Sequence, residues 1–72
     1  MSSVKASLKA AKIALDARLY TGAAEEARKA LASDPGNYHG YVFLGLALEK
    51  QDQDDASEKA YLSATGIKET MS

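Results

Sequence analysis

A single proline divides the chain, and its surroundings constrain the fold more than any other feature. Pro35 lies in the stretch Asp34-Pro35-Gly36-Asn37, near the middle of the 72 residues. Proline cannot continue a helix because it has no amide hydrogen, so the helix-forming run 25–33 must end before it. Glycine and asparagine beside proline favour a turn. The sequence therefore predicts a helix, a turn and a second helix across this point.

The composition limits both the core and the classes of partner. Alanine is the commonest residue, which favours closely spaced helices over a thick interior. The chain has nine Lys and Arg residues and ten Asp and Glu residues, so its net charge is close to zero. Such a chain has no strong electrostatic attraction to nucleic acid or to an anionic membrane. There is no cysteine, which excludes disulfides and thiolate chemistry. With no secretory signal and no long apolar run, we expect a small, all-α, soluble and intracellular protein.

Four helical segments follow from apolar periodicity and from helix breakers. The first carries an apolar residue every third or fourth position until Thr21 and Gly22 interrupt it. The fourth follows the polar stretch 51–55 and is expected to weaken from Gly66 onward. The predicted segments are residues 3–19, 21–33, 38–50 and a last helix from about residue 56.

The two halves of the chain also resemble each other when residues 4–37 are laid over residues 38–71. We call this superposition the repeat alignment. Only one aligned pair is identical. Residue size agrees better, because Ala11 falls on Gly45 and small residues would lie where helices cross. We therefore predict one domain made of two helical hairpins, with repeat one over residues 4–37 and repeat two over residues 38–71.

A recognisable motif begins at Tyr41, where the sequence reads YVFLGLAL and is followed by S-x3-Y and an alanine. It resembles the tetratricopeptide repeat, a pair of antiparallel helices in which large and small residues at fixed positions let the helices approach closely. Repeat one lacks the Leu-Gly pair, and repeat two has Glu69 in place of the closing proline. The resemblance implies four antiparallel helices that begin a right-handed superhelix. The repeat-packing positions are Tyr20, Ala23, Ala27, Ala30, Pro35, Tyr41, Leu44, Gly45, Leu48, Ser57, Tyr61 and Ala64.

A narrower resemblance covers residues 1–67. The opening MSSVKASLKAAKIALDARLYTGAAEEARKAL and the segment NYHGYVFLGLALEK are similar to the N-terminus of the tetratricopeptide scaffold subunits of Superkiller complexes. That family implies a non-catalytic, cytoplasmic protein-binding scaffold, with an RNA helicase and WD40 subunits as partners, which assists the exosome in 3′–5′ mRNA decay. An adaptor of another pathway, such as a co-chaperone or an organelle-import protein, stays open as an alternative.

Partners of tetratricopeptide arrays bind in the concave groove lined by the first helix of each repeat. Apolar side chains there would anchor a helix or an extended peptide, and lysines would meet acids. The same residue types also suit helices that only cover one another, and this alternative stays open. The resemblance places in the groove Lys5, Leu8, Lys12, Leu15, His39, Val42, Leu46, Glu49 and Lys50.

The sequence has no constellation for catalysis or for metal binding. His39 is the only histidine, so no histidine cluster can hold a metal. The acids Asp52, Asp54 and Asp55 lack the glycine and the distant glutamate of a calcium-binding loop, and helix capping explains them better. No Ser-His-Asp set or carboxylate pair on an apolar wall is present. We therefore expect no enzyme activity and no cofactor.

Direct contact with RNA is the third functional class. Lys5, Lys9 and Lys12 lie near one face of the first helix, where they would reach phosphates. Three lysines on an exposed helix are more often a solvated face, and no exposed aromatic pair is predicted that would stack on bases. Direct binding of nucleic acid is therefore not the preferred interpretation.

Two repeats alone bury little continuous core, since arrays of this kind usually need about three. The open end of repeat two is expected to expose Phe43, Leu62 and Ile67. We therefore predict that the chain is a fragment of a longer array, associates with itself, or is held by a larger partner. Dimerisation through the open end, with or without a swapped helix, is the testable form of self-association.

Overall fold

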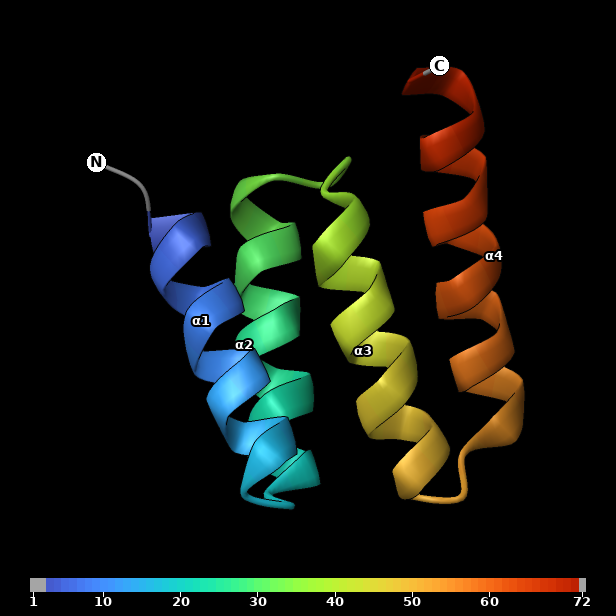
Figure 1. Cartoon of the computed structure of the whole chain (residues 1–72). Coiled ribbons are helices and arrows are strands. Elements are labelled where there is room, and N and C mark those ends of the chain that lie inside the picture. The colour runs from blue at the N-terminus through green and yellow to red at the C-terminus, as the bar shows by residue number, and fades with distance from the viewer. Residues whose placement is uncertain (1–2, 72) are drawn as a thin grey trace.

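The computed structural model describes the backbone of residues 3–71 and the side chains of residues 4–67. In that part of the chain there is no strand, and the helices are α1 (Ser3–Asp16), α2 (Tyr20–Ser33), α3 (Tyr38–Lys50) and α4 (Asp54–Met71). The four helices follow one another in a row, with α1 and α4 at opposite ends (Figure 1). The all-α prediction is confirmed.

Each helix packs against its neighbours in the chain. Helix α2 packs against both α1 and α3, α3 also touches α1, and α4 packs against α3 alone. The result is two antiparallel hairpins, α1–α2 and α3–α4, which lie side by side in a slab of 32 × 32 × 17 Å. This arrangement is compatible with two hairpins of the tetratricopeptide type. Within the described chain, one side of α4 therefore has no helix against it.

Helix α1 ends at Asp16, before the predicted end at Leu19, because the chain turns at Arg18. The backbone of Arg18 is left-handed, with φ 63°. Its amide donates to the carbonyl of Leu15 at 3.0 Å, and the amide of Leu19 donates to the carbonyl of Ala14 at 2.8 Å. These two hydrogen bonds form the Schellman arrangement, which closes a helix through one left-handed residue.

The second hairpin repeats this turn at the equivalent position of the repeat alignment. Asp52 is left-handed, with φ 62°. Its amide donates to the carbonyl of Glu49 at 3.1 Å, and the amide of Gln53 donates to the carbonyl of Leu48 at 2.9 Å. The internal repeat is therefore present in the backbone hydrogen bonds, although the residues at these positions differ between the hairpins.

The break between the first two helices lies at residues 17–19 and not at Thr21 and Gly22, where the sequence analysis placed it. Helix α2 begins at Tyr20 and includes both residues. No glycine of the described chain has a positive φ, so Gly22 is an ordinary helical residue. The left-handed position is held by an arginine, a residue that rarely adopts this conformation, and residue preferences alone do not indicate it.

The turn at the proline forms as predicted. The amide of Asp34 closes α2 on the carbonyl of Ala30 at 2.8 Å, and the amide of Asn37 donates to the carbonyl of Asp34 at 3.0 Å. The side-chain oxygen of Asn37 accepts the amide of Gly40 at 2.8 Å, which caps α3. Pro35 is exposed and belongs to the turn. Helix α3 then has the predicted bounds.

Helix α4 is longer than the sequence indicated. It begins at Asp54, where Asp54 and Asp55 supply acidic side chains to its first turn. Carboxylates are favourable there because the amino end of a helix is partly positive. The helix also continues through Gly66 to Met71, so the expected weakening at Gly66 is not observed. The side chain of Glu69, predicted to replace a proline, lies outside the described residues.

Small residues form the interior. The described chain has no fully buried large side chain, so neighbouring helices approach one another closely. One cluster of buried alanines, with partly buried Ala14, Leu15 and Leu44 packed against it, joins α1, α2 and α3. The buried residues include Ala11, Ala23, Ala24, Ala27, Ala30, Ala47, Leu48, Ser57, Ala60 and Ala64.

The second hairpin is closed by the ring of Tyr61 lying against Gly45. A Cβ atom at Gly45 would be 2.7 Å from Cε1 and 2.8 Å from Cδ1 of that ring. Beside this contact, the hydroxyl of Ser57 donates to the carbonyl of Gly45 at 2.8 Å. The equivalent residues of the first hairpin are Ala11 and Ala27, both fully buried. A glycine and a tyrosine thus fill the space that two alanines occupy in the other hairpin.

Replacing Gly45 with alanine tests this close approach. The added methyl group would meet the Tyr61 ring, and overpacking costs about 1 to 3 kcal/mol, partly offset by about 1 kcal/mol of better helix propensity. We expect the free energy of unfolding to fall by about 1 kcal/mol in urea titrations followed by circular dichroism. Gly66→Ala is the matched control, because nothing lies within 4 Å of a Cβ there, and it should raise stability by about 0.5 to 1 kcal/mol. Stabilisation by both exchanges would contradict the proposed contact.

Candidate functional site

The predicted groove residues lie on α1 and α3, the two helices that touch each other across the hairpins. None of them is fully buried. Apolar side chains therefore remain accessible between charged ones, as a shallow binding surface requires. Lys5, Lys12, His39, Glu49 and Lys50 are exposed, and Leu8, Leu15, Val42 and Leu46 are partly buried.

Among the predicted groove residues, Leu15 and Glu49 contact neighbouring helices. Leu15 packs against the buried cluster that joins α1, α2 and α3. Glu49, its equivalent in the repeat alignment, accepts a hydrogen bond from the hydroxyl of Tyr61 on α4 at 3.1 Å. The other apolar side chains at the predicted groove positions are those of Leu8, Val42 and Leu46, which are partly buried. We call these three residues the apolar groove.

A small aromatic group lies at the start of α3. The His39 ring meets the Tyr38 ring edge to face, with centroids 5.4 Å apart, and lies 6.4 Å from the Phe43 ring. His39 is exposed, while Phe43 is partly buried. The expectation that Phe43 would be exposed is therefore wrong. Residues described by the structure include no group of three His, Cys, Asp or Glu side chains that could hold a metal ion.

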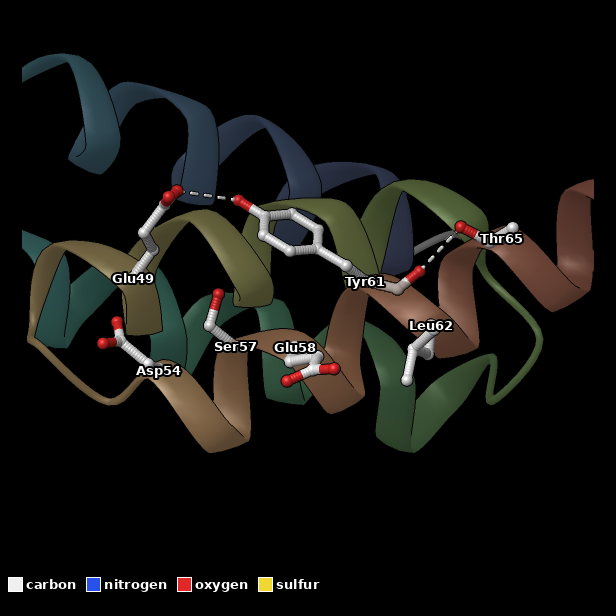
Figure 2. A pocket seen from close by; sticks show the side chains of 7 residues that line it. All are labelled: Glu49, Asp54, Ser57, Glu58, Tyr61, Leu62 and Thr65. Atoms are coloured by element: carbon white, nitrogen blue, oxygen red, sulfur yellow. Dashed lines mark hydrogen bonds between the residues drawn. The ribbon is translucent and has the colours of Figure 1, made fainter.

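A hollow that the sequence pattern does not indicate lies on α4. Helix α3 contributes only Glu49 to it, and the other lining residues lie on one face of α4 (Figure 2). Within this set, Leu62 is 63% exposed. The hollow is lined by Glu49, Asp54, Ser57, Glu58, Tyr61, Leu62 and Thr65, and we call it the α4 hollow.

Two hydrogen bonds organise the α4 hollow. The hydroxyl of Tyr61 reaches the carboxylate of Glu49 on α3, which fixes the ring across the gap between the two helices (Figure 2). The hydroxyl of Thr65 donates to the backbone carbonyl of Tyr61 at 3.0 Å. Burial, and then the hydrogen bond and negative charge of Glu49, raise the pKa of Tyr61 above its ordinary value. The folded chain therefore keeps the phenol protonated, and able to donate to Glu49, up to a higher pH than the unfolded chain does.

The α4 hollow has an acidic character. Its lining includes the carboxylates of Glu49, Asp54 and Glu58 and no basic side chain. Asp55 and Lys59 border it. Of the three hydrophobic residues expected at the open end, Leu62 is exposed as predicted, whereas Phe43 and Ile67 are partly buried. This surface therefore combines one apolar side chain with several negative charges, which suits a partner that is both apolar and basic.

Comparison with known proteins points to one group of relatives. Superkiller protein 3 of Schizosaccharomyces pombe is 46% identical over 65 residues, which are 90% of this chain and 5% of that protein. Human Superkiller complex protein 3 is 31% identical over 64 residues, which are 89% of this chain and 4% of that protein. Over most of its length the chain is a homologue of these proteins. The predicted resemblance to Superkiller scaffold subunits is confirmed.

A further relative carries the name of the repeat. Tetratricopeptide repeat protein 37 of Xenopus laevis is 34% identical over 64 residues, which are 89% of this chain and 4% of that protein. The chain thus spans only about one twentieth of the length of these relatives. No family model matches the chain, and no solved structure matches it significantly. In the described part of the present chain, no helix is long and apolar enough to cross a membrane.

The hydrogen bond between Tyr61 and Glu49 predicts a pH dependence of stability. Because the folded state raises the pKa of Tyr61, it holds the phenol proton more tightly than the unfolded chain does. This contribution is complete below the unfolded pKa of about 10 and is lost as pH rises through the folded pKa. We expect the free energy of unfolding to decline in this alkaline range, and to decline less in Tyr61→Phe. Urea titrations at a series of pH values measure both slopes.

Glu49→Gln provides the control for this effect. It removes the negative charge that raises the pKa of Tyr61 but keeps a side chain of similar size. The alkaline decline should therefore be intermediate between those of the wild-type chain and Tyr61→Phe. Identical slopes in the three proteins would show that Tyr61 is not held neutral by the fold.

Proposed function

We propose that the chain is a non-catalytic protein-binding module of a Superkiller scaffold and acts in cytoplasmic 3′–5′ mRNA decay. The observation that carries this proposal is the 46% identity to Superkiller protein 3 over 90% of the chain. The four-helix fold supports it, because paired antiparallel helices are the units from which tetratricopeptide scaffolds are built. The two repeats are assigned to residues 4–37 and 38–71.

The names of the relatives suggest the class of partner. The human relative is named as a protein of the Superkiller complex, so that protein belongs to an assembly of several proteins. We propose protein partners of the same complex for this chain, namely an RNA helicase and WD40 subunits, with the exosome as an indirect partner. The chemistry of the described residues agrees with binding, since apolar side chains lie between charged ones on α1 and α3.

The apolar groove is the proposed contact on this chain. Leu8 on α1 and Val42 and Leu46 on α3 are partly buried side chains on two helices that touch. Three apolar anchors on adjacent helices would accept the apolar face of a partner helix or an extended segment. The exposed Lys5, Lys12 and Lys50 around them would meet acidic residues of that partner.

A chimera tests the proposed role in a complete scaffold. The matched 65 residues of the Schizosaccharomyces pombe relative are replaced by the matching part of this chain. We expect the tagged chimera to copurify with the complex and to restore the decay rate of a reporter mRNA that is degraded from its 3′ end. A scaffold that lacks the segment is the reference. Normal assembly and decay without the segment would contradict the proposal.

Substitutions in the same chimera test the apolar groove. Leu8→Glu combined with Leu46→Glu places two carboxylates among apolar contacts, and each lost anchor costs about 2 kcal/mol or more in a typical interface. We expect copurification of at least one partner to fall by about tenfold or more. Leu19→Glu is the matched control, because Leu19 is 62% exposed and lies outside the groove. Equal losses in both variants would show that the groove is not the contact.

The same samples distinguish protein binding from direct binding of RNA. A module that contacts RNA phosphates would bind a single-stranded RNA with an affinity that falls steeply as salt rises. Changing Lys5, Lys9 and Lys12 to glutamate would then abolish binding. We expect neither effect from the isolated chain. Salt-sensitive binding that these three changes remove would replace the protein-scaffold proposal with an RNA-binding one.

A further inference from the structure

Helices α1 and α4 each leave one outer side uncovered in the described chain. On α1 this side carries apolar residues, among which Ala6 and Ala17 are exposed and Ile13 is 58% exposed. On α4 it is the α4 hollow, with exposed Leu62 among carboxylates. The two surfaces lie at opposite ends of the row of helices (Figure 1). They can therefore meet only when they belong to different molecules.

The contact between α2 and α3 shows how this fold seats a following helix. At one end, Leu31 of α2 lies so close to Gly40 that a Cβ there would be 2.8 Å from the leucine Cδ2. In the middle, Ala47 of α3 is buried in the cluster that α1 and α2 share. At the other end, the side-chain nitrogen of Gln51 donates to the hydroxyl of Thr21 at 2.9 Å. Two positions in α3 and the residue that follows it thus define its contact with the preceding hairpin.

Helix α1 carries the same contact positions. The repeat alignment relates Gly40 and Ala47 of α3 to Ala6 and Ile13 of α1. It also relates Gln51, directly after α3, to Ala17, directly after α1. Ala6, Ile13 and Ala17 are small or apolar, and all three are exposed. Apolar side chains in a row on an exposed helix face indicate a surface that another element covers. Helix α1 therefore has the face with which α3 packs on a hairpin, but no hairpin precedes it in the described chain.

Helix α4 carries the positions equivalent to those of α2 that lie at the contact with α3. The repeat alignment relates Thr21, Ala24 and Leu31 of α2 to Asp55, Glu58 and Thr65 of α4, and it relates Leu15 of α1 to Glu49 of α3. Glu49, Glu58 and Thr65 line the α4 hollow, and Asp55 borders it. The hollow is thus the equivalent of the surface that receives α3. The difference is chemical, since the carboxylates of Glu49 and Glu58 stand at the positions of the apolar Leu15 and Ala24.

We propose that the α4 hollow seats α1 of a second copy of this chain, as the α1–α2 hairpin seats α3. Charge complementarity selects this occupant. Lys9, Lys12 and Arg18 are exposed on or directly after α1, beside the apolar face. They would lie near the carboxylates of the hollow, while Ile13, the equivalent of Ala47, would lie beside Ser57 and Glu58, the equivalents of Ala23 and Ala24. With Lys5 and Asp16 included, the α1 surface carries four basic side chains and one acidic one. The α4 surface carries four acidic side chains and one basic one, which are Glu49, Asp54, Asp55, Glu58 and Lys59.

The same charges disfavour the symmetric dimer that the sequence suggested. Two α4 hollows facing each other would bring Asp54, Asp55 and Glu58 of one copy against the same acids of the other. Like charges opposed across an interface are repulsive. Contact between α1 and α4 is instead a head-to-tail interface, which leaves one α1 and one α4 free at the ends of every open assembly. Assembly therefore continues beyond the dimer unless the copies close into a ring.

Sedimentation and light scattering of the 72-residue chain over a range of concentrations test the interface. We expect the mean mass to rise past that of two chains as concentration increases. We also expect assembly to weaken severalfold between about 0.1 M and about 1 M salt, because screening shortens the reach of charges. A chain that stays monomeric at millimolar concentration, or that stops at a salt-insensitive dimer, overturns the proposal.

Charge reversal identifies the two surfaces. One variant carries Lys9→Glu and Lys12→Glu on α1, and the other carries Asp55→Lys and Glu58→Lys on α4. We expect each variant alone to assemble at least about tenfold more weakly, because like charges then face each other. An equimolar mixture should assemble again, since each variant surface now meets an oppositely charged one. Circular dichroism shows whether each variant keeps its helices.

A matched control carries the same types of change away from both surfaces. Glu25→Lys and Arg28→Glu exchange two exposed residues of α2 without altering the net charge. This variant should assemble as the wild-type chain does. If it is impaired like the others, or if the mixture of charge-reversed variants fails to assemble, the head-to-tail interface is wrong. The outcome is independent of the proposed role in mRNA decay.

Discussion

Close approach of helix backbones is the constraint on which the rest of the structure depends. A chain whose buried residues are mostly alanines can bury enough surface only if its helices come very near to one another. Gly45 shows how strict this requirement is, because the Tyr61 ring occupies the space of a side chain there. The same ring extends its hydroxyl to Glu49 and so forms part of the α4 hollow. Tyr61 therefore both packs two helices together and contributes to the surface of the α4 hollow.

The helix bounds were predicted well where they depend on residues next to the helix end. The turn at Pro35 and the bounds of α3 follow from residues that cannot continue a helix or that cap one, and the structure agrees. The end of α1 was missed because the left-handed turn residue is Arg18, whose conformation is imposed by two backbone hydrogen bonds of the surrounding turn. Gly22 was misleading because a glycine can also be helical.

The surfaces were harder to predict than the helices. A motif identifies which positions of a repeat face a groove, but it does not show that Glu49 turns toward Tyr61 or that Leu15 joins the interior. Nor did residue identity reveal the α4 hollow, since only one pair is identical when the halves are superposed. The hollow becomes recognisable once the contacts of the first hairpin are known. The repeat alignment then relates Glu58 on α4 to Ala24 on α2, which is buried.

The position of α4 at the end of the row also affects how the molecule opens. Helix α4 packs against α3 alone, whereas α2 is held from both sides. In arrays of stacked helices the end unit opens locally at a lower cost than global unfolding, so we expect amide hydrogens of α4 to exchange with solvent sooner than those of α2. All the residues that line the hollow except Glu49 belong to α4. The acidic surface therefore exists only while the last helix is docked, and any molecule bound there slows the opening of that end.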